Sequence, residues 1–331
     1  MHNLNLSTQD ISWMAAQGIL VLILVLACMP WLIRKLHDLK FGQTEREEGL
    51  ASHKSKTGTP TMGGLIFIVI PLIVYLVFAF FSPFGLNLNT LIIWLSFAGY
   101  GLIGFLDDYI IAVKKDNTGL KPGVKFAMQS VLAIIVFFMY RSANSTEILI
   151  PGTGLSLDLG WFYFLIVFLM FTGCTNAVNL SDGVDGLCAG LCAIALVPFF
   201  VFACWQQMFD TAAICFIVFM ALLGYLHFNV HPAKVFMGDT GSLALGGLLA
   251  ALAMVLKEEL ILIVVGGVFV AETISVILQV TYYKKTHKRI FLMAPVHHHF
   301  EKKGWSEWKV DLVFWAWGVL FAVLGIWLGG M

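Results

Sequence analysis

Three short polar stretches carry five aspartates and interrupt an otherwise apolar chain. The aspartates are Asp107 and Asp108 in FLDDY, Asp182 and Asp185 in NLSDGVDG, and Asp239 in FMGDTGS. Clustered carboxylate oxygens suit Mg²⁺, which proteins typically hold through one or two carboxylates together with substrate phosphates and water. If the stretches meet in space, they predict a metal-assisted reaction at a phosphate group.

The spacing around three of these aspartates indicates separate tasks. Adjacent residues on a helix point about 100° apart, so one of Asp107 and Asp108 is expected to hold a metal ion while the other faces a substrate. Asp239 opens an apolar run, where Thr240 and Ser242 offer caps for the helix start. Such a start also attracts phosphate. A capping role for Asp239 itself is the alternative.

The second stretch combines amides and carboxylates at a regular spacing. Neighbours three residues apart share a helix face, although a straight helix would turn the row away over nine residues. Gly183 and Gly186 therefore predict that the helix ends early and that the last two aspartates lie on a turn. The four residues in this row are Asn176, Asn179, Asp182 and Asp185.

A fourth polar stretch, PVHHHFEKKGW, carries His297, His298 and His299. Three consecutive histidines point in different directions and cannot all bind one ion, so a zinc site is not favoured. The run is internal and too short for a purification tag. It is best interpreted as a hydrogen-bonding wall for phosphates or sugar hydroxyls.

The composition predicts the elements that must position these residues. The chain has 331 residues, of which 59% are hydrophobic and 12% are charged, whereas soluble domains carry roughly 25% charged residues. It is expected to be an all-α polytopic membrane protein with one membrane domain over residues 1–331. Zero formal net charge gives no argument for nucleic-acid binding. Ten apolar segments are predicted spans, near 17–36, 63–84, 91–110, 125–141, 159–180, 187–206, 211–229, 237–256, 260–283 and 310–329.

The basic residues predict how the spans are oriented. With both termini outside, every Lys and Arg except Arg141 and Lys257 lies on the inner side, as the positive-inside rule requires. This N-out/C-out topology places all five aspartates and the histidines at the cytoplasmic face. On the periplasmic side, residues 147–159 alternate around a Pro-Gly-Thr-Gly turn, which predicts a small β-hairpin.

In this order, GFLDDY, NAVNLSDGVDGL, FMGDTGSLALGG and PVHHHFEKKGW resemble the bacterial phospho-N-acetylmuramoyl-pentapeptide-transferases, a branch of the polyprenyl-phosphate N-acetylhexosamine-1-phosphate transferases. The aspartate motifs indicate only the superfamily, and the histidine motif narrows it to this branch. The resemblance implies a bacterial inner-membrane enzyme that transfers phospho-N-acetylmuramoyl-pentapeptide from UDP-N-acetylmuramoyl-pentapeptide to undecaprenyl phosphate. The products would be lipid I and UMP, with Mg²⁺ as cofactor and a homodimer as the expected assembly.

The resemblance also implies roles for individual residues. Asp239 is the first choice for Mg²⁺, Asp107 would orient or deprotonate the lipid phosphate, and Asp108 would support the metal or substrate. The three histidines would complete the catalytic set. Residues expected to bind the substrates are Lys56, Lys125, Asn176, Asn179, Asp182, Asp185, Asn229, Phe236 and Gln279. Glu272 shares a helix face with Gln279, and a hydrogen bond between helices is its simpler interpretation.

Three other functions remain alternatives at this point. The nearest is a sister enzyme that uses UDP-N-acetylglucosamine, and donor choice separates the two. An ion-coupled transporter would place its acidic residues near the membrane midplane, whereas these lie at one edge. An inactive scaffold does not require the full set of aspartates.

Overall fold

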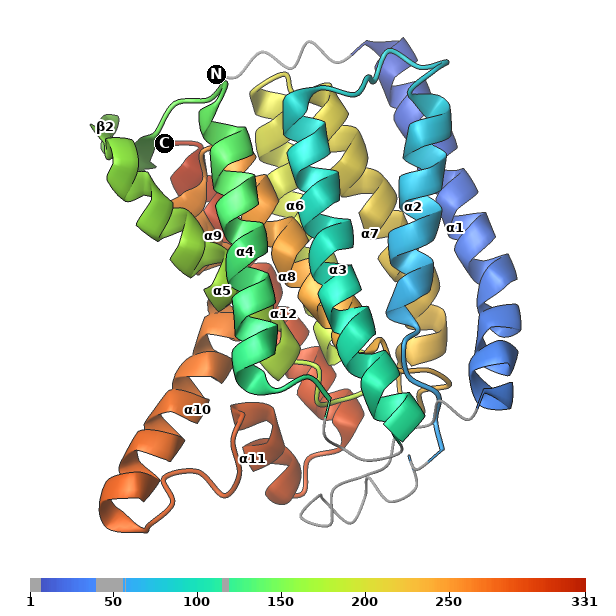
Figure 1. The fold of residues 1–331 in the computed structure, drawn as a ribbon, viewed down its shortest axis with the longest axis vertical. Coiled ribbons are helices and arrows are strands. Elements are labelled where there is room, and N and C mark those ends of the chain that lie inside the picture. The colour runs from blue at the N-terminus through green and yellow to red at the C-terminus, as the bar shows by residue number, and fades with distance from the viewer. Residues whose placement is uncertain (1–6, 40–55, 57, 115–118) are drawn as a thin grey trace.

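The computed structural model describes residues 7–39, 56, 58–114 and 119–331, which form a bundle of helices with one small hairpin (Figure 1). The elements are α1 (Thr8–Asp38), α2 (Gly64–Phe78), α3 (Leu88–Lys114), α4 (Pro122–Arg141), β1 (Glu147–Ile150), β2 (Leu155–Asp158), η2 (Gly160–Phe162), α5 (Tyr163–Leu180), α6 (Leu187–Trp205), α7 (Phe209–Asn229), α8 (Gly238–Val255), α9 (Glu259–Val265), α10 (Gly267–Thr286), α11 (Val296–Lys302) and α12 (Glu307–Gly329).

The all-α membrane architecture is confirmed, with differences in two of the ten predicted spans. Among the described residues, eight helices are long and apolar enough to cross a membrane, or nine if α9 and α10 form one span. The second predicted span, 63–84, contains only the 15-residue helix α2. At 1.5 Å per residue, that helix is shorter than a hydrocarbon core of about 30 Å.

The predicted ninth span is not one straight helix. Its two parts, α9 and α10, meet at Gly266 and differ in direction by 78°. A side chain on the next residue, Gly267, would collide with the ring of Phe321, so glycine lets α12 pack tightly at the bend. Beyond it, α10 leaves the bundle (Figure 1) and exposes apolar side chains such as Ile274 and Ile277.

The most enclosed helix is α8, which packs between α3 and α5. In its apolar window 89% of the residues are buried, compared with 22% in α12. Small residues allow this approach, because a Cβ at Gly246 would overlap the backbone of Thr175, and one at Gly247 would crowd the ring of Tyr100. Membrane helices commonly pack through such residues. The helix that begins with Asp239 is therefore the fixed centre of the bundle.

The predicted hairpin forms at one end of the bundle. β1 and β2 pair antiparallel, with Ile150 opposite Leu155. The two basic residues that the sequence placed outside both lie here: Arg141 stacks on Trp161, and Lys257 donates to backbone carbonyls next to the hairpin.

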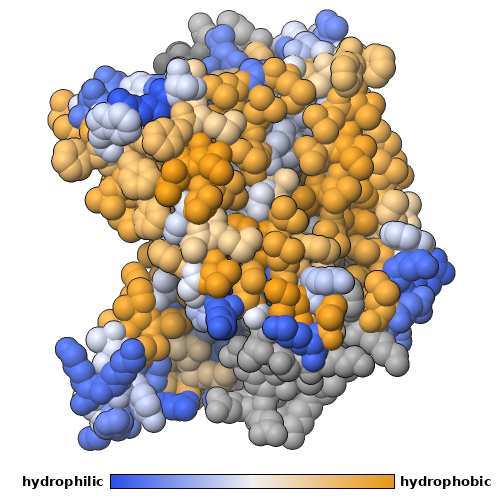
Figure 2. All heavy atoms as spheres, in the orientation of Figure 1, coloured by the Kyte–Doolittle hydropathy of each residue, from blue (hydrophilic) through white to orange (hydrophobic). Residues whose placement is uncertain are grey.

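The two ends of the bundle are chemically different. α1 begins and α12 ends at the hairpin end (Figure 1), which agrees with an even number of crossings. Figure 2 shows apolar side chains across the middle of the visible face and hydrophilic ones at its two ends. Basic residues that contribute to the predicted orientation but lie outside the described residues are Lys40, Arg46, Lys54 and Lys115.

Candidate active site

The aspartates lie together at the end of the bundle opposite the hairpin. Asp107 and Asp108 occupy the last turns of α3, and Asp239 is in the first turn of α8. The turn between α5 and α6 carries Asp182 and Asp185, which confirms that the helix ends before them. Segments distant in sequence therefore meet at one end of the fold.

One lysine joins the first two motifs. Lys125 of α4 donates to Asp107 Oδ2 at 3.2 Å and to Asp239 Oδ2. Asp107 Oδ1 also accepts the N–H of Leu120 at 2.5 Å, and Asp239 Oδ1 accepts Asn179 Nδ2 at 2.8 Å. We call Asp107, Lys125, Asn179 and Asp239 the Lys125 cluster. The Asp239 side chain keeps 26% of its surface exposed, so a ligand has access to it.

Asp108 faces the backbone of α8 instead. Its carboxylate accepts the N–H groups of Asp239 and Thr240 and the hydroxyl of Thr240. The sequence-based prediction that Thr240 and Ser242 cap this helix is therefore wrong, since Thr240 donates to Asp108 and Ser242 donates to the carbonyl of Gly238. The cap comes from another helix, which local sequence rules do not consider.

A second group of charged side chains is centred on Lys56 and comes from other segments of the chain. Lys56 Nζ contacts Asp185 Oδ1 at 2.7 Å and Glu307 Oε2 at 2.6 Å. His231 Nδ1 lies 3.1 Å from Asp185 Oδ2 and 3.4 Å from Glu307 Oε1. We call these four residues the Lys56 cluster. The Asp185, His231 and Glu307 ligand atoms are close enough together to hold a metal ion, and the ammonium of Lys56 offsets part of the charge of the two carboxylates.

The electrostatic surroundings of Lys56 and Asp182 differ. Burial opposes the charge of Lys56, but the carboxylates of Asp185 and Glu307 outweigh it and raise the pKa of Lys56. For Asp182, the charge of Lys56 lowers the pKa, but other causes outweigh it. Burial first, and then the charges of Asp239, Asp108 and Asp185, raise the pKa of Asp182 to about 8. Asp182 is therefore mainly neutral at pH 7, whereas Lys56 is charged.

The residues predicted to bind the nucleotide lie near the turn between α5 and α6. Asn229 ends α7, where its Oδ1 accepts the N–H of Gly186 at 3.1 Å and its Nδ2 donates to Val235. Phe236 pairs through its backbone with the segment that precedes α2. Asn176 lies one turn further into α5 and donates to Gln129 Oε1.

The three histidines lie on the short helix α11 and have different surroundings. His297 is fully buried on α11, and its Nδ1 lies 3.1 Å from Oε2 of Glu272 on α10, but these atoms form no hydrogen bond, so the predicted interhelical hydrogen bond of Glu272 stays a prediction. His298 Nδ1 lies 2.6 Å from Glu301 Oε2. His299 Nδ1 accepts the N–H of Leu292. A Cβ at Gly183 would meet the rings of His297 and His298, which places α11 directly against the aspartate turn.

Gln279 is placed differently from the other predicted residues. Its Oε1 accepts the N–H groups of Ile290 and Phe291, at 3.1 and 2.9 Å. Gln279 therefore braces the chain that returns from α10 to α11. A direct contact of Gln279 with substrate stays a prediction.

Sequence reasoning missed Glu307, His231 and the buried Asp311. Glu307 and Asp311 are four residues apart at the start of α12, so they share a helix face. This acidic pair in EWKVD, just before an apolar span, was the available signal. His231 stood in a short His-Pro turn and gave no comparable pattern.

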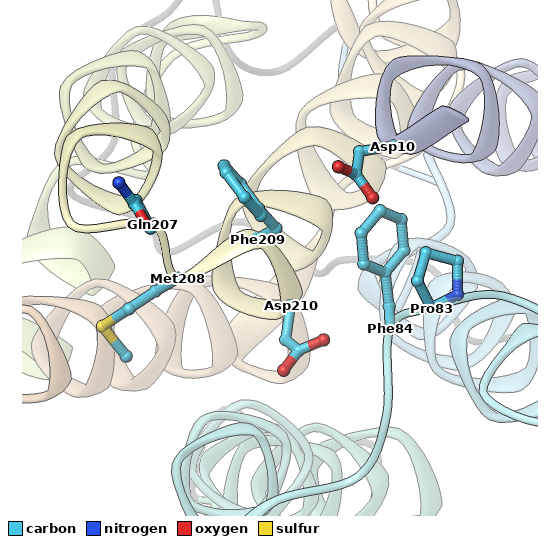
Figure 3. Close-up of a pocket in the computed structure, with 7 residues that line it drawn as sticks. All are labelled: Asp10, Pro83, Phe84, Gln207, Met208, Phe209 and Asp210. Carbon is cyan, nitrogen blue, oxygen red and sulfur yellow. The ribbon is translucent and has the colours of Figure 1, made fainter. Parts of the chain in front are cut away.

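The cavity in Figure 3 lies at the other end of the molecule. It has a volume of about 220 Å³ and is lined by the starts of α1 and α7 and by the loop before α3. It contains none of the predicted site residues. Its two carboxylates are already paired, Asp10 with Ser7 and Asp210 with Gly85 and Asn87.

Known proteins resemble this chain over nearly its whole length. A family model described as Glycosyl transferase family 4 matches residues 90–257, which include all five aspartates. A phospho-N-acetylmuramoyl-pentapeptide-transferase of Bacillus mycoides (strain KBAB4) is 51% identical over 323 residues, covering 96% of this chain and 99% of that protein. The enzymes of that name from Bacillus anthracis and Bacillus thuringiensis (strain Al Hakam) are each 50% identical, with the same coverage.

Proposed function

Since this chain belongs to the phospho-N-acetylmuramoyl-pentapeptide-transferase family, we propose that it transfers phospho-N-acetylmuramoyl-pentapeptide from UDP-N-acetylmuramoyl-pentapeptide to undecaprenyl phosphate. The products are lipid I and UMP. The chain is a multi-pass protein of the bacterial inner membrane, and this reaction is the first membrane step of peptidoglycan synthesis. A lipid-borne acceptor requires a membrane enzyme, and a nucleotide donor requires an aqueous face.

The observation that carries the proposal is the Lys125 cluster. Carboxylates from α3 and α8 and an amide from α5 converge on one cation at an end of the bundle. Both substrates bring negatively charged phosphates, so the site must supply positive charge between them. Phosphoryl transfer depends mainly on positioning and charge neutralisation. The cluster provides the groups for both.

Mg²⁺ fits the donor set of this cluster. Asp107 and Asp239 direct one oxygen each at the same ammonium group, so they offer hard oxygen ligands around one point, as Mg²⁺ prefers. Asp239 and Asp107 would hold the ion, and Asp108 was also predicted to do so. When bound, Mg²⁺ would neutralise phosphate charge and strengthen the electrophilic character of the phosphorus that is attacked.

Asp107 would orient the acceptor phosphate. The second pKa of a phosphate monoester is about 6, so the acceptor is mostly dianionic at pH 7 and requires no strong base. Lys125, which contacts both carboxylates that would hold the ion, would bind phosphate. A covalent aspartyl-phosphate route is the mechanistic alternative. Inversion of configuration at a chiral phosphorus would support direct transfer, and retention would support the covalent route.

The remaining predicted residues divide between the two halves of the donor. Asn179, Asp182, Asp185, Asn229 and Phe236 would bind the uridine, with Lys56 beside them. His298 and His299 are more accessible than the buried His297, and would contact the pyrophosphate or the sugar. The enrichment of basic residues favours the cytoplasmic face for the whole site. A homodimer stays a prediction from the family.

The test is an assay of the purified protein in detergent with both substrates and Mg²⁺, scored by release of UMP. We expect release that stops on addition of EDTA and resumes with excess Mg²⁺. Release with UDP-N-acetylglucosamine but not with the muramoyl-pentapeptide donor would contradict the proposed substrate. Activity that is unaffected by EDTA would contradict the metal requirement alone.

A further inference from the structure

The first turn of α8 is held by a carboxylate that comes from α3. The first N–H groups of any helix have no partner within that helix, and Met237, the residue before α8, supplies no side-chain cap. Asp108 supplies it instead. It accepts the N–H of Asp239 at 3.1 Å, the N–H of Thr240 at 2.9 Å and the Thr240 hydroxyl at 2.6 Å.

Glycines make this contact between helices possible. A Cβ at Gly104 would overlap the backbone of Asp239, so α3 approaches the start of α8 only because position 104 has no side chain. A Cβ at Gly238 would overlap the Asp108 carboxylate, and Gly238 also has a φ of +68°, which disfavours other residues. Gly104 and Gly238 therefore allow the Asp108 carboxylate to reach the start of α8.

The two neighbouring acids consequently contact different groups. Oδ1 of Asp108 accepts from Asp239, and Oδ2 accepts twice from Thr240. Asp108 is also only 5% exposed. The Asp239 side chain points instead at Lys125 and Asn179 and is more accessible. Both oxygens of Asp108 are thus already used, whereas Asp239 can exchange a partner.

We propose that Asp108 is a positioning residue that fixes the Asp239 backbone, and thereby directs the Asp239 carboxylate, without contacting the metal ion itself. This inference rests on the proposed function, in which Asp239 holds a divalent cation. Asp108 was expected to bind the metal directly, and here it acts instead through the backbone of Asp239. Thr240 becomes part of the same arrangement, because its hydroxyl orients the Asp108 carboxylate.

Thr240→Val tests the proposal, since it removes the hydroxyl and nearly preserves the shape of the side chain. The measurement is binding of Mn²⁺ to the full-length protein in detergent, followed by electron paramagnetic resonance. We expect about three- to tenfold weaker binding, the usual effect of one lost hydrogen bond. At saturating Mg²⁺ we expect kcat to stay near that of the unmodified protein, because the metal ligands are intact. Thr240→Ser keeps the hydroxyl and should restore binding.

The matched control is Thr175→Val. Thr175 is also fully buried, but its hydroxyl donates only to carbonyls of its own helix, α5, at Phe171 and Thr172. We expect this variant to bind Mn²⁺ like the unmodified protein. Melting temperatures of all variants show whether each is folded, so that weak binding is not confused with unfolding.

Asp108→Asn completes the test as a double-mutant cycle. Alone, it should weaken Mn²⁺ binding more than Thr240→Val, because its amide would face backbone N–H groups. In the double variant the effect of Thr240→Val should largely disappear, since both act through one contact. Unchanged Mn²⁺ binding in Thr240→Val, with binding lost in Asp108→Asn, would overturn the proposal and make Asp108 a direct ligand. An unmodified protein that binds no Mn²⁺ would instead overturn the metal role in the proposed function, together with this inference.

Discussion

Two lysines hold pairs of carboxylates at the same end of this molecule, but their surroundings differ. In the Lys56 cluster, Asp185 and Glu307 have 2% and 9% of their side-chain surface exposed. Asp185 also accepts the N–H of Ala233, and Glu307 accepts the N–H of Asp185. These contacts join the aspartate turn, the segment after α7 and the start of α12. The carboxylates of the Lys56 cluster are therefore enclosed in a structural junction, although its His231 side chain is 39% exposed.

The Lys125 cluster is more open. Asp239 is 26% exposed, and Lys125 reaches it from a helix, α4, that lies at the edge of the bundle. An exposed carboxylate can exchange its cationic partner at lower cost than an enclosed one, because water replaces the lost contacts. The greater exposure of Asp239, compared with Asp185 and Glu307, indicates that a cation is exchanged at Lys125 and retained at Lys56. The following predictions test this distinction.

The largest effect is expected for Asp239→Asn. This change removes the charge that would hold the metal and leaves Lys125 with Asp107 as its acidic partner, so turnover should fall by about 1000-fold. UMP release at fixed substrate concentrations measures it. Asp210→Asn is the matched control, because Asp210 also lies in the first turn of a helix but at the hairpin end. Equal losses in both variants would contradict a site at Asp239.

Lys125→Met should separate catalysis from metal binding. Turnover is expected to fall by about 100-fold, because the site loses a cation that meets phosphate. Mn²⁺ should bind more tightly, since no ammonium competes for Asp107 and Asp239. Steady-state kinetics and Mn²⁺ titration are compared on one preparation. Weaker Mn²⁺ binding would show that Lys125 supports the metal site and does not compete with the ion.

Lys56→Met should lower stability as well as binding of the donor. It leaves two buried carboxylates without a cation, and breaking such a buried pair typically costs about 3–5 kcal/mol. The melting temperature in detergent should fall clearly. Lys234→Met, which removes an exposed lysine, should change it little. A normal melting temperature for Lys56→Met would mean that the Lys56 cluster is not a structural junction.

The last prediction concerns pH and Asp182. The pKa of Asp182 in the fold is about 8, compared with about 3.9 for an unfolded aspartate. Between about pH 3.9 and pH 8, Asp182 is therefore protonated in the folded chain and ionised in the unfolded chain. The free energy of unfolding falls as the pH rises through this window. Relative to Asp182→Asn, which mimics the neutral form, the melting temperature should fall from pH 5 to 8 and level off above. Parallel curves for the two proteins would contradict a neutral Asp182.

Local patterns predicted much of this architecture. Apolar runs, the turn at Gly183 and the hairpin depend on residues close in sequence, and the helices, the turn and the hairpin formed where they were expected. The bend at Gly266 was not predicted, because apolarity measures whether a segment can cross a membrane and says nothing about its direction. The length of α2 was overestimated, because the apolar run continues to Phe84 although the helix ends at Phe78.

The structure brings the predicted aspartates together at one end of the bundle, but the sequence did not predict their contacts. Sequence indicated that Asp107 and Asp108 would face different ways, because of helix geometry. It did not indicate that Asp108 caps α8, since that contact joins residues 131 positions apart. The pairing of Lys56 with Glu307 also joins residues far apart in the sequence. Only the packed fold determines them.

Mn²⁺ binding measured in Asp239→Asn and Glu307→Gln tests the central comparison most directly, because each variant removes one charge from one cluster. The account predicts that binding is lost in Asp239→Asn and retained in Glu307→Gln. The reverse pattern, with binding lost only in Glu307→Gln, would place the ion among Asp185, His231 and Glu307 and contradict the assignment of the metal to Asp239.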